Sequence, residues 1–243
     1  MKDSSYHLLT RILDALIWGG ELLGEENLPE EGPAVFIANH LGPLGPIGSI
    51  CSLPFRLYPW VVGEMIDPGL APDYIRVDFV EPRLKLTPPI SNVISKALTK
   101  VTVPMFRSIE GIPSYYLRKQ EFIYETLEKS LTKLKEGKFL LVFPEYAILG
   151  SDSMKRIYPF QKTVFRLGEM YYSATRHNLR FYPVAVHESH KVKLGAPFKF
   201  SPLTRAVKER LRLKRLLESA VYQLYLEMDR DNPPEKMLTP STN

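Results

Sequence analysis

Apolar runs and amphipathic stretches alternate along the chain from residue 34 to residue 229. Short, nearly continuous apolar runs are typical of parallel strands buried on both faces, and they predict strands at 34–38, 60–66, 101–106, 139–143, 180–186 and 191–197. Apolar residues at helical spacing predict helices at 46–53, 91–101, 114–136, 162–176 and 203–229. Residues 67–90 are rich in Pro and Asp, and 74–79 fits either a helix or a strand. The alternation predicts one α/β domain with a central, largely parallel sheet flanked by helices.

The N-terminal stretch 4–23 reads as an amphipathic helix. Its apolar face is formed by Leu8, Leu9, Ile12, Leu13, Leu16 and Ile17. One interpretation is an anchor lying in the plane of a membrane surface, with Trp18 at the interface. The other is a helix packed on the core of the domain. The chain is therefore divided into the N-terminal helix (1–23), the α/β domain (24–230) and a loose tail (231–243).

The composition is that of a globular protein, with 243 residues, 44% hydrophobic and 24% charged. A net charge of +5 and a pI near 9.1 fit an anionic partner such as a phosphate ligand, a membrane surface or nucleic acid, or only a basic surface. The single cysteine, Cys51, lies in an apolar context and predicts a small buried residue in a reducing compartment. No signal peptide and no bilayer-spanning stretch is found, which predicts a cytoplasmic location.

Four predicted strands end in residues that can carry chemistry. These ends are Asn39-His40, Phe106-Arg107, Phe143-Pro144-Glu145 and Tyr182-Pro183. Parallel strands bring their carboxyl ends to one edge of a sheet, where α/β folds bind ligands. A histidine acting as a base needs a partner that holds its ring, and the first acid downstream of His40 is Glu64. Glu64 is therefore the expected carboxylate partner, with Asp67 next.

The order and context of these segments resemble the glycerolipid acyltransferase family, which includes the PlsC-like lysophosphatidate acyltransferases. The resemblance covers roughly residues 24–200 and rests on the segments 24–40, 103–107, 134–145, 181–186 and 192–197. It implies a glycerolipid-acyltransferase-like fold and acyl transfer from acyl-CoA or acyl carrier protein. In such a reaction a histidine deprotonates the acceptor hydroxyl, which attacks the thioester. By motif position His40 is that base.

Two motifs depart from the family pattern. The family's aspartate, five positions after the histidine, orients the ring, and Gly45 occupies its place. In serine proteases the loss of such a partner lowers the rate by about 10⁴. In the third motif, Tyr146 replaces a glycine, and Ala147-Ile148 replaces the usual Thr/Ser-Arg. This second loop must take a different path, because tyrosine tolerates a positive φ poorly.

The resemblance also assigns an acceptor site to Asn39, Arg107 and Glu145, with Arg107 as the candidate for binding the phosphate of the acceptor or of the acyl carrier. Lys155 or Arg156 could replace the arginine lost from the third motif; the alternative is that both are surface charges. No cofactor is implied beyond the acyl thioester, and no metal.

Two further segments contain charged or metal-binding residue types, and for each of them a solvated surface is the alternative to a binding site. His187-Glu188-Ser189-His190 lacks the H-E-x-x-H spacing of a zinc site and predicts a solvated loop. The basic run 205–215 fits anionic lipid head groups or a solvated helix face, and no nucleic-acid-binding motif is present.

Two functional hypotheses remain. The first is an O-acyltransferase that acylates a lysophospholipid or a glycerol-phosphate-type hydroxyl, peripheral on the inner face of the membrane. The second is a catalytically impaired homologue that binds lipid or a protein partner. Gly45 and Tyr146 favour the second, whereas His40, Arg107 and Glu145 favour the first.

Overall fold

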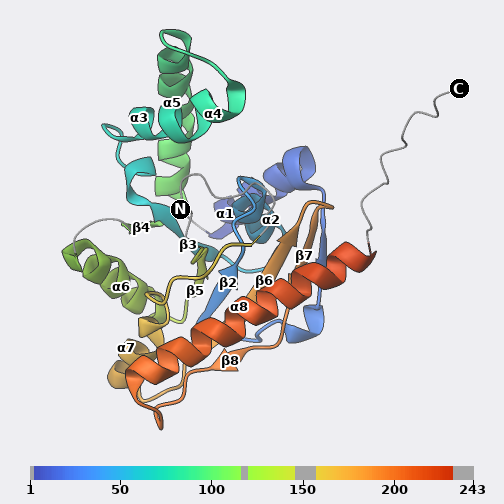
Figure 1. Ribbon diagram of the computed structural model, residues 1–243, viewed down its shortest axis with the longest axis vertical. Helices are drawn as coiled ribbons and strands as arrows, with labels where there is room; N and C mark the ends of the chain where they lie inside the picture. The colour runs from blue at the N-terminus through green and yellow to red at the C-terminus, as the bar shows by residue number, and fades with distance from the viewer. Residues whose placement is uncertain (1–2, 116–119, 146–156, 232–243) are drawn as a thin grey trace, which may run out of the picture.

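The computed structural model describes residues 3–115, 120–145 and 157–231, and within them eight strands form one mixed sheet. The strands are β1 (Glu21–Leu23), β2 (Ala34–Ala38), β3 (Leu57–Val62), β4 (Ile112–Ser114), β5 (Phe139–Val142), β6 (Arg180–His187), β7 (Lys191–Leu194) and β8 (Phe198–Lys199). Their order is β1-β7-β6-β2-β5-β3-β4, and β8 pairs with β6 (Figure 1). Only the pairings β6–β7 and β6–β8 are antiparallel among the described strands. The predicted α/β class with a largely parallel sheet is confirmed.

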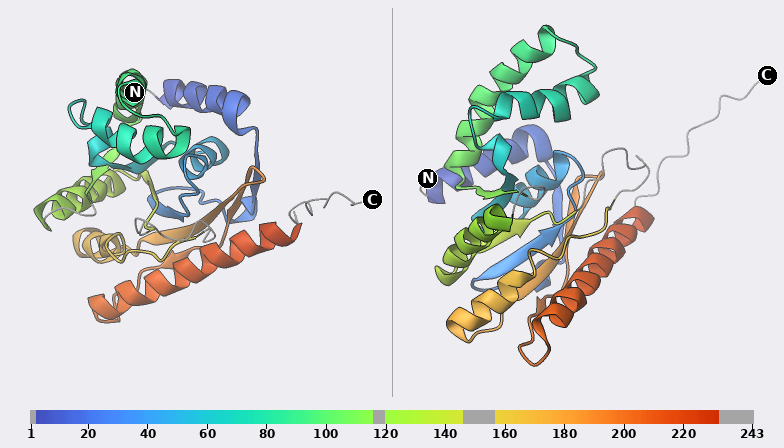
Figure 2. Two further views of the ribbon diagram at one scale, coloured as in Figure 1. Left: turned by 45° about the horizontal axis from the view of Figure 1, so that its top comes forward. Right: turned by 60° about the vertical axis from the view of Figure 1, so that its left-hand side comes forward.

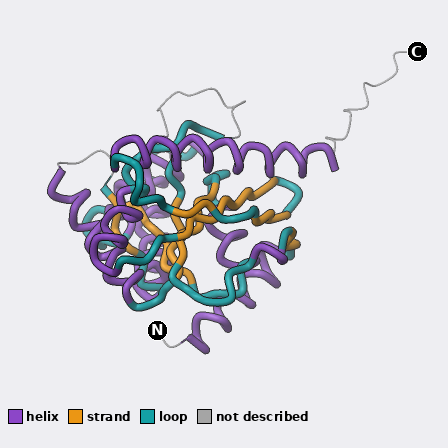
Figure 3. The backbone as a smooth tube through the Cα atoms, turned by 90° about the horizontal axis from the view of Figure 1, so that it is seen from below, coloured by secondary structure: helices purple, strands orange, loops and turns teal. Residues whose placement is uncertain are grey.

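Helices cover both faces of the sheet (Figures 2 and 3). They are α1 (Asp3–Leu13), α2 (Leu44–Ser52), α3 (Ala71–Ile75), α4 (Glu81–Leu84), α5 (Ile90–Ser108), α6 (Gln120–Lys135), α7 (Arg166–Thr175) and α8 (Ala206–Asp231). Val35 and Ile37 of β2 pack against the cluster that α6, α7 and α8 contribute to. Phe36 and Ala38 pack on the other face, against residues of α2 and Trp18. Because successive side chains of a strand point to opposite faces, β2 is buried on both sides, as its apolar run predicts.

A lobe of helices, residues 71–108, is inserted between β3 and β4 and projects beyond the sheet (Figure 1). It comprises α3, a π-helical segment Arg76–Val80, α4 and α5, and it has its own small core. Residues 74–79, open between helix and strand in the sequence, are helical.

The predicted strand at 101–106 is wrong, because α5 continues through these residues to Ser108. Val101-Thr102-Val103 is a β-branched run that favours a strand locally. Burial of Ser91, Ser95, Thr99 and Val103 at intervals of four residues fixes a helix instead. The strand that follows is β4, which ends at Ser114. The next helix, α6, begins at Gln120 rather than at residue 114.

Other boundaries moved by a few residues. Strand β3 covers Leu57–Val62, and a 3₁₀ turn, Gly63–Met65, replaces the end of the predicted strand 60–66. The short strand β8 was not predicted.

The N-terminal helix ends earlier than the sequence predicts. A π-helical turn, Asp14–Trp18, follows α1, and β1 then joins the sheet in parallel with β7. Gly19, with φ 55°, allows the chain to leave the helix at this point. The helix predicted over 4–23 is therefore wrong beyond Trp18.

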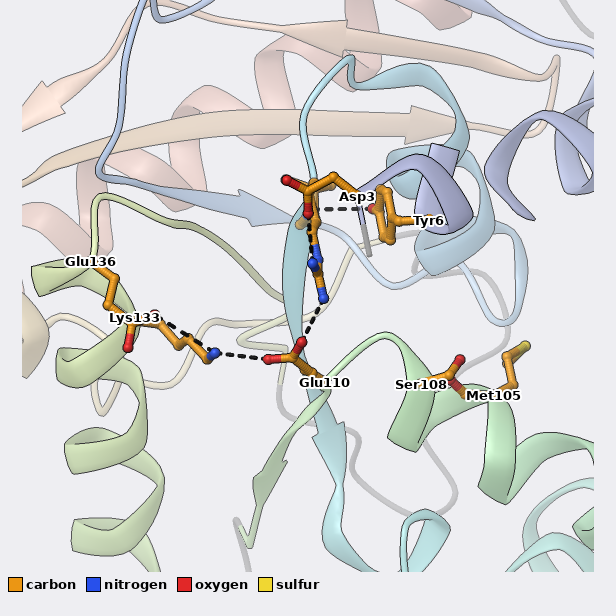
Figure 4. Close-up of polar contacts among 9 residues, drawn as sticks. Asp3, Tyr6, Met105, Ser108, Glu110, Lys133 and Glu136 are labelled. Atoms are coloured by element: carbon orange, nitrogen blue, oxygen red, sulfur yellow. Dashed lines mark hydrogen bonds and ion pairs between the residues drawn. The ribbon is translucent and has the colours of Figure 1, made fainter. Parts of the chain in front are cut away.

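Helix α1 is docked on the body of the protein by polar contacts (Figure 4). Asp3 pairs with Arg56 at 2.6 Å, Arg56 with Glu110 at 2.6 Å, and Glu110 with Lys133 at 2.8 Å. The buried Tyr6 hydroxyl accepts a hydrogen bond from the Leu57 backbone N–H at 3.1 Å. Burial raises the pKa of Tyr6 to about 12, so this hydroxyl stays protonated.

The apolar face of this N-terminal segment points to solvent rather than into the core. Leu8, Ile12, Leu16 and Ile17 are 61%, 47%, 78% and 48% exposed. Trp18, in contrast, is buried, and its indole N–H donates to Ser52 Oγ at 2.9 Å. Packing of the apolar face on the core is thus wrong for these four residues, and an interfacial position is wrong for Trp18.

Candidate active site

The register of the sheet brings His40 and Glu145 together at its carboxyl edge. Ala34 of β2 is level with Phe139 of β5, and Ile37 with Val142. Continuing that register by three residues places His40 level with Glu145. The His40 backbone N–H donates to Glu145 Oε2 at 3.0 Å, and the exposed His40 residue has its ring edge-on to Phe143, 5.2 Å between centroids. A histidine and a carboxylate predicted separately from the sequence thus meet in one place.

Asn39 holds the end of β2 against β6. Its side chain is completely buried, its Nδ2 donates to the Val186 carbonyl at 2.9 Å, and its Oδ1 accepts from the Val186 N–H at 2.7 Å. The amide therefore replaces a pair of backbone hydrogen bonds just where β2 ends. This geometry positions the His40 backbone, and both polar atoms of Asn39 are already used by β6.

The turn from β2 into α2 is built around Gly45. Leu41 and Gly42 are both left-handed, with φ 41° and 59°, and α2 begins at Leu44. A Cβ on Gly45 would lie 1.8 Å from the His40 carbonyl oxygen and 2.8 Å from that of Asn39. Since real Cβ atoms do not approach backbone atoms so closely, no side chain fits at position 45 without moving α2. The turn is thus closed at the position where the resemblance places an aspartate.

No protein-family model matches the chain, and no curated protein matches it. Among solved structures, it is similar to the 1-acyl-sn-glycerophosphate (LPA) acyltransferase PlsC from Thermotoga maritima, with a TM-score of 0.52 and 14% identity. The match covers 91% of this chain and 82% of that one. The chain has the PlsC fold. At this identity the likeness concerns the fold alone, and it confirms the glycerolipid-acyltransferase-like architecture expected from the sequence.

At this edge of the PlsC fold, the carboxyl group of Glu145 has a strongly raised pKa. Burial raises its pKa to about 7, although the N–H groups of His40 and Tyr158 donate to its two oxygens and act in the opposite direction. The segment that begins at residue 157 is held here too, since Phe160 forms an isolated β-bridge with Glu145 and the Gln161 N–H donates to the Pro144 carbonyl at 2.7 Å. A carboxyl group that is half protonated near neutral pH therefore sits beside the His40 backbone.

The raised pKa of Glu145 predicts that the free energy of unfolding depends on pH. In the folded protein Glu145 binds a proton up to about pH 7, whereas in the unfolded chain it loses the proton near 4.5. The folded state thus binds more protons between these values, and its stability falls as pH rises through them, by up to about 3 kcal/mol. In Glu145→Gln this part of the pH dependence should be absent, leaving a constant offset for the altered hydrogen bonds.

Urea unfolding at a series of pH values measures the effect as the difference between the wild type and the variant. Glu128→Gln, at an exposed position on α6, is the matched control and should run parallel to the wild type. A wild-type–Glu145→Gln difference that stays constant from acid to mildly alkaline pH would contradict the burial of this carboxyl.

Glu64 and Arg107 lie together at the end of β3, away from β2. Strand β5 lies between β2 and β3, so the two strand axes are about 10 Å apart. Glu64 is on the 3₁₀ turn after β3, and its charge contributes to raising the pKa of Tyr74 in the lobe. Arg107, exposed in the last turn of α5, donates from Nε to the Ile66 carbonyl at 3.0 Å. The structure thus gathers Asn39, His40 and Glu145 at one point, and Glu64 with Arg107 at a second.

Tyr146, Lys155 and Arg156 lie outside the described residues. The backbone N–H of Tyr158, just beyond them, is a contact to Glu145 that the sequence did not predict. A backbone donor has no residue signature, so no sequence signal could have found it.

The predicted solvated loop at 187–190 is wrong for its histidines, which pack against other elements, whereas Glu188 and Ser189 between them are exposed. His187 is only 5% exposed; its Nδ1 is 2.8 Å from Ser189 Oγ, and its Nε2 is 3.1 Å from Asp229 Oδ1 of α8. His190 stacks on Trp18, with ring centroids 5.0 Å apart. These contacts fasten the β6–β7 hairpin to α8 and to the N-terminal segment. Among the described residues, no group of three or more His, Cys, Asp or Glu is placed to hold a metal ion.

A groove of about 740 Å³ runs between residues 157–159 and α8. Tyr222 and Tyr225 give it aromatic walls, and Lys214 and Arg215 give it positive charge. Helix α8 covers the sheet face opposite to α2, so this groove lies on the other side of the sheet from the turn that follows His40.

Proposed function

We propose that this chain is an O-acyltransferase that moves a fatty acyl group from acyl-CoA or acyl carrier protein to a lysophospholipid or glycerol-phosphate-type hydroxyl. The observation that carries the proposal is a histidine fixed at the carboxyl end of β2, beside a half-buried carboxyl group, on a PlsC fold. The Thermotoga protein with this fold is described as an LPA acyltransferase, and lysophosphatidate is therefore the first acceptor to test.

The chemistry needs one base and no redox partner. The His40 ring takes the proton of the acceptor hydroxyl as its oxygen attacks the thioester carbonyl carbon. The new carbon–oxygen bond forms, the carbon–sulfur bond breaks, and the departing sulfur takes the proton back from the imidazolium. No bound cofactor or metal is required, because the acyl thioester is itself the co-substrate.

In this proposal Glu145 replaces part of what an aspartate at position 45 would do. It does so through the backbone, since its carboxyl fixes the His40 N–H while Asn39 fixes the preceding residue to β6. Glu64 lies two strands away and is a weaker candidate for the partner. Arg107 and Arg156 remain the proposed ligands of acceptor or carrier phosphate, because a guanidinium binds phosphate oxygens in pairs.

We also place the reaction at a membrane surface. The exposed apolar side chains Leu8, Ile12, Leu16 and Ile17 form a stripe of the kind that inserts into the interface of a bilayer. An acceptor with a long acyl chain is held in such a bilayer, so contact with lipid brings enzyme and acceptor together. The proposed location is peripheral, on the inner face of the membrane.

No helix in the described part of the chain is both long and apolar enough to cross a bilayer.

A second candidate function is a non-catalytic module that binds lipid or a protein partner. The observation that favours it is Gly45, whose contact with the His40 carbonyl leaves no room for the orienting aspartate. Where the module binds lipid, the two hypotheses differ only in turnover.

The test is direct. Purified protein is incubated with labelled long-chain acyl-CoA or acyl carrier protein, and with lysophosphatidate or other lysophospholipids in vesicles. The proposal expects a labelled diacyl product whose formation depends on His40. Binding of the acceptor without any product, from either donor, would leave the non-catalytic function standing.

A further inference from the structure

Helix α5 has apolar residues on its solvent-facing side as well as on the side that packs into the lobe. The buried side carries Ser91, Ser95, Thr99 and Val103, with Ile94 and Leu98 partly buried against the lobe core. The side that faces solvent carries an apolar stripe, Ile90, Val93, Ala97, Val101 and Pro104. Their spacing of three and four residues keeps all five within a narrow sector of the helix. Ile90 is 56% exposed, and Val93 and Val101 are each 67% exposed. A stripe that the fold does not bury indicates a contact with another body.

Positive charges border this stripe. Lys96 and Lys100 are exposed one turn apart on the same side of it, and within the described residues neither forms an ion pair. An apolar stripe flanked by free lysines matches helices that lie in the interface of an anionic bilayer. A compact protein partner would have to bury or pair these two ammonium groups.

The position of α5 in the fold also favours contact with a bilayer. The ion pairs Asp3–Arg56–Glu110 hold the start of α1 beside the residue two positions after the end of α5 (Figure 4). Two separate elements with exposed apolar stripes are therefore neighbours. Arg107, in the last turn of α5, donates to the Ile66 carbonyl in the segment after β3, so α5 ends at the carboxyl edge of the sheet that carries the candidate site.

We infer that the solvent-facing side of α5 binds an anionic phospholipid surface, with Ile90, Val93 and Val101 inserted at the level of the acyl chains and Lys96 and Lys100 at the lipid phosphates. The inference rests on the proposed function only for its purpose, which is to hold the site against the membrane. Lipid binding is measured without turnover, so the α5 inference and the proposed function can fail separately.

The N-terminal part of α8 is the competing surface. It exposes Val207 to the same extent as Val93, 67%, within a basic run. Its charges are partly neutralised, because Arg212 pairs with Glu209 at 2.6 Å and Lys214 with Glu218 at 2.6 Å. It also lies at the opposite end of the molecule from the lobe (Figure 1), so one flat bilayer would not meet both.

Co-sedimentation with vesicles of phosphatidylcholine containing roughly one quarter phosphatidylglycerol separates these surfaces. Val93→Asp/Val101→Asp is expected to lower the partition coefficient at least about tenfold. Val207→Asp, a substitution of the same chemistry at the same exposure, should leave it within about twofold. Loss of binding in Val207→Asp with retention in the α5 variant would overturn the inference.

A second variant tests how much the two lysine charges contribute to vesicle binding. Lys96→Gln/Lys100→Gln should weaken binding about 30-fold at low salt, since each cation near an anionic surface contributes roughly fivefold, and the deficit should vanish at high salt. Lys208→Gln on α8 is the control for a single lost surface charge.

Three further readouts keep the result decisive. Circular dichroism and thermal unfolding should be unchanged, because the substituted residues are exposed. Gel filtration without lipid should give one mass for the wild type and the α5 variant, and a smaller mass for the variant would assign the stripe to self-association instead. Transfer to a short-chain, water-soluble acceptor should be equal in both if the proposed function holds. No transfer in either, together with intact vesicle binding, would defeat the function and leave the α5 inference in place.

Discussion

His40→Gln is expected to lower kcat/KM for acyl transfer by about 10³-fold, with KM for the acceptor nearly unchanged. The glutamine cannot take the proton of the acceptor hydroxyl, and general-base catalysis by a positioned side chain contributes roughly 10²–10⁴ in rate. The exposed residue lies at the end of β2, so the substitution should leave the core intact. Steady-state kinetics with purified variants of equal thermal stability measure the effect.

His177→Gln is the matched control, because His177 is also exposed but lies in the loop after α7, before β6. It should retain the wild-type rate. Transfer that survives in His40→Gln at about the wild-type rate would remove His40 from the mechanism, even if the chain proves to be an acyltransferase.

Much of the fold could be predicted from local patterns, because β2, β5 and β6 are short apolar runs buried on both faces. The helical lobe could be predicted only in part. Apolar spacing predicts a helix over 91–101, but the β-branched run that follows and Pro104 favour a strand or a break, whereas α5 continues to Ser108. Packing of α5 against α3 decided the outcome there, against local propensity.

The candidate site was predictable to the extent that it depends on strand ends. The sequence placed His40 and Glu145 at the ends of two strands, but it did not show that these strands are neighbours. The choice of Glu64 as partner followed chain proximity, whereas the sheet order places β5, and hence Glu145, between β2 and β3. The roles of Asn39 and of the Tyr158 N–H depend on backbone contacts between distant segments, which leave no residue pattern.

The contacts around His40 bear on whether the departures at positions 45 and 146 reflect a rebuilt site or a lost one. The completely buried Asn39 amide is bound twice to β6, and the half-buried Glu145 carboxyl accepts from the histidine N–H. Buried polar groups destabilise the fold unless fully hydrogen-bonded, and these are satisfied. The contacts fix the backbone of His40 through the Asn39 amide and the Glu145 carboxyl.

Gly45→Asp therefore should not restore an ancestral site, and we expect it to lower the free energy of unfolding by about 3 kcal/mol or more and to reduce transfer. The new Cβ would meet the carbonyl groups of His40 and Asn39, which are backbone atoms and cannot rotate away. Relief requires α2 to move from β2, and overpacking of this kind destabilises by about 1–3 kcal/mol even where side chains can adjust. Urea unfolding and the transfer assay on the same preparations measure both effects.

Two alanine variants separate the clash from the charge. Gly45→Ala carries the same Cβ without the carboxylate and should account for most of the loss, because the contact at 1.8 Å exists already for that atom. Gly69→Ala, where a Cβ would meet only the Asp67 side chain at 3.2 Å, should change stability by less than about 0.5 kcal/mol. If Gly45→Asp is as stable as the wild type and transfers acyl groups faster, the β2–α2 turn is not closed as described, and the orienting aspartate is what this site lacks. If instead Gly45→Ala reproduces the instability while Gly69→Ala does not, the glycine is required by the turn itself, and an aspartate cannot orient His40 from this position.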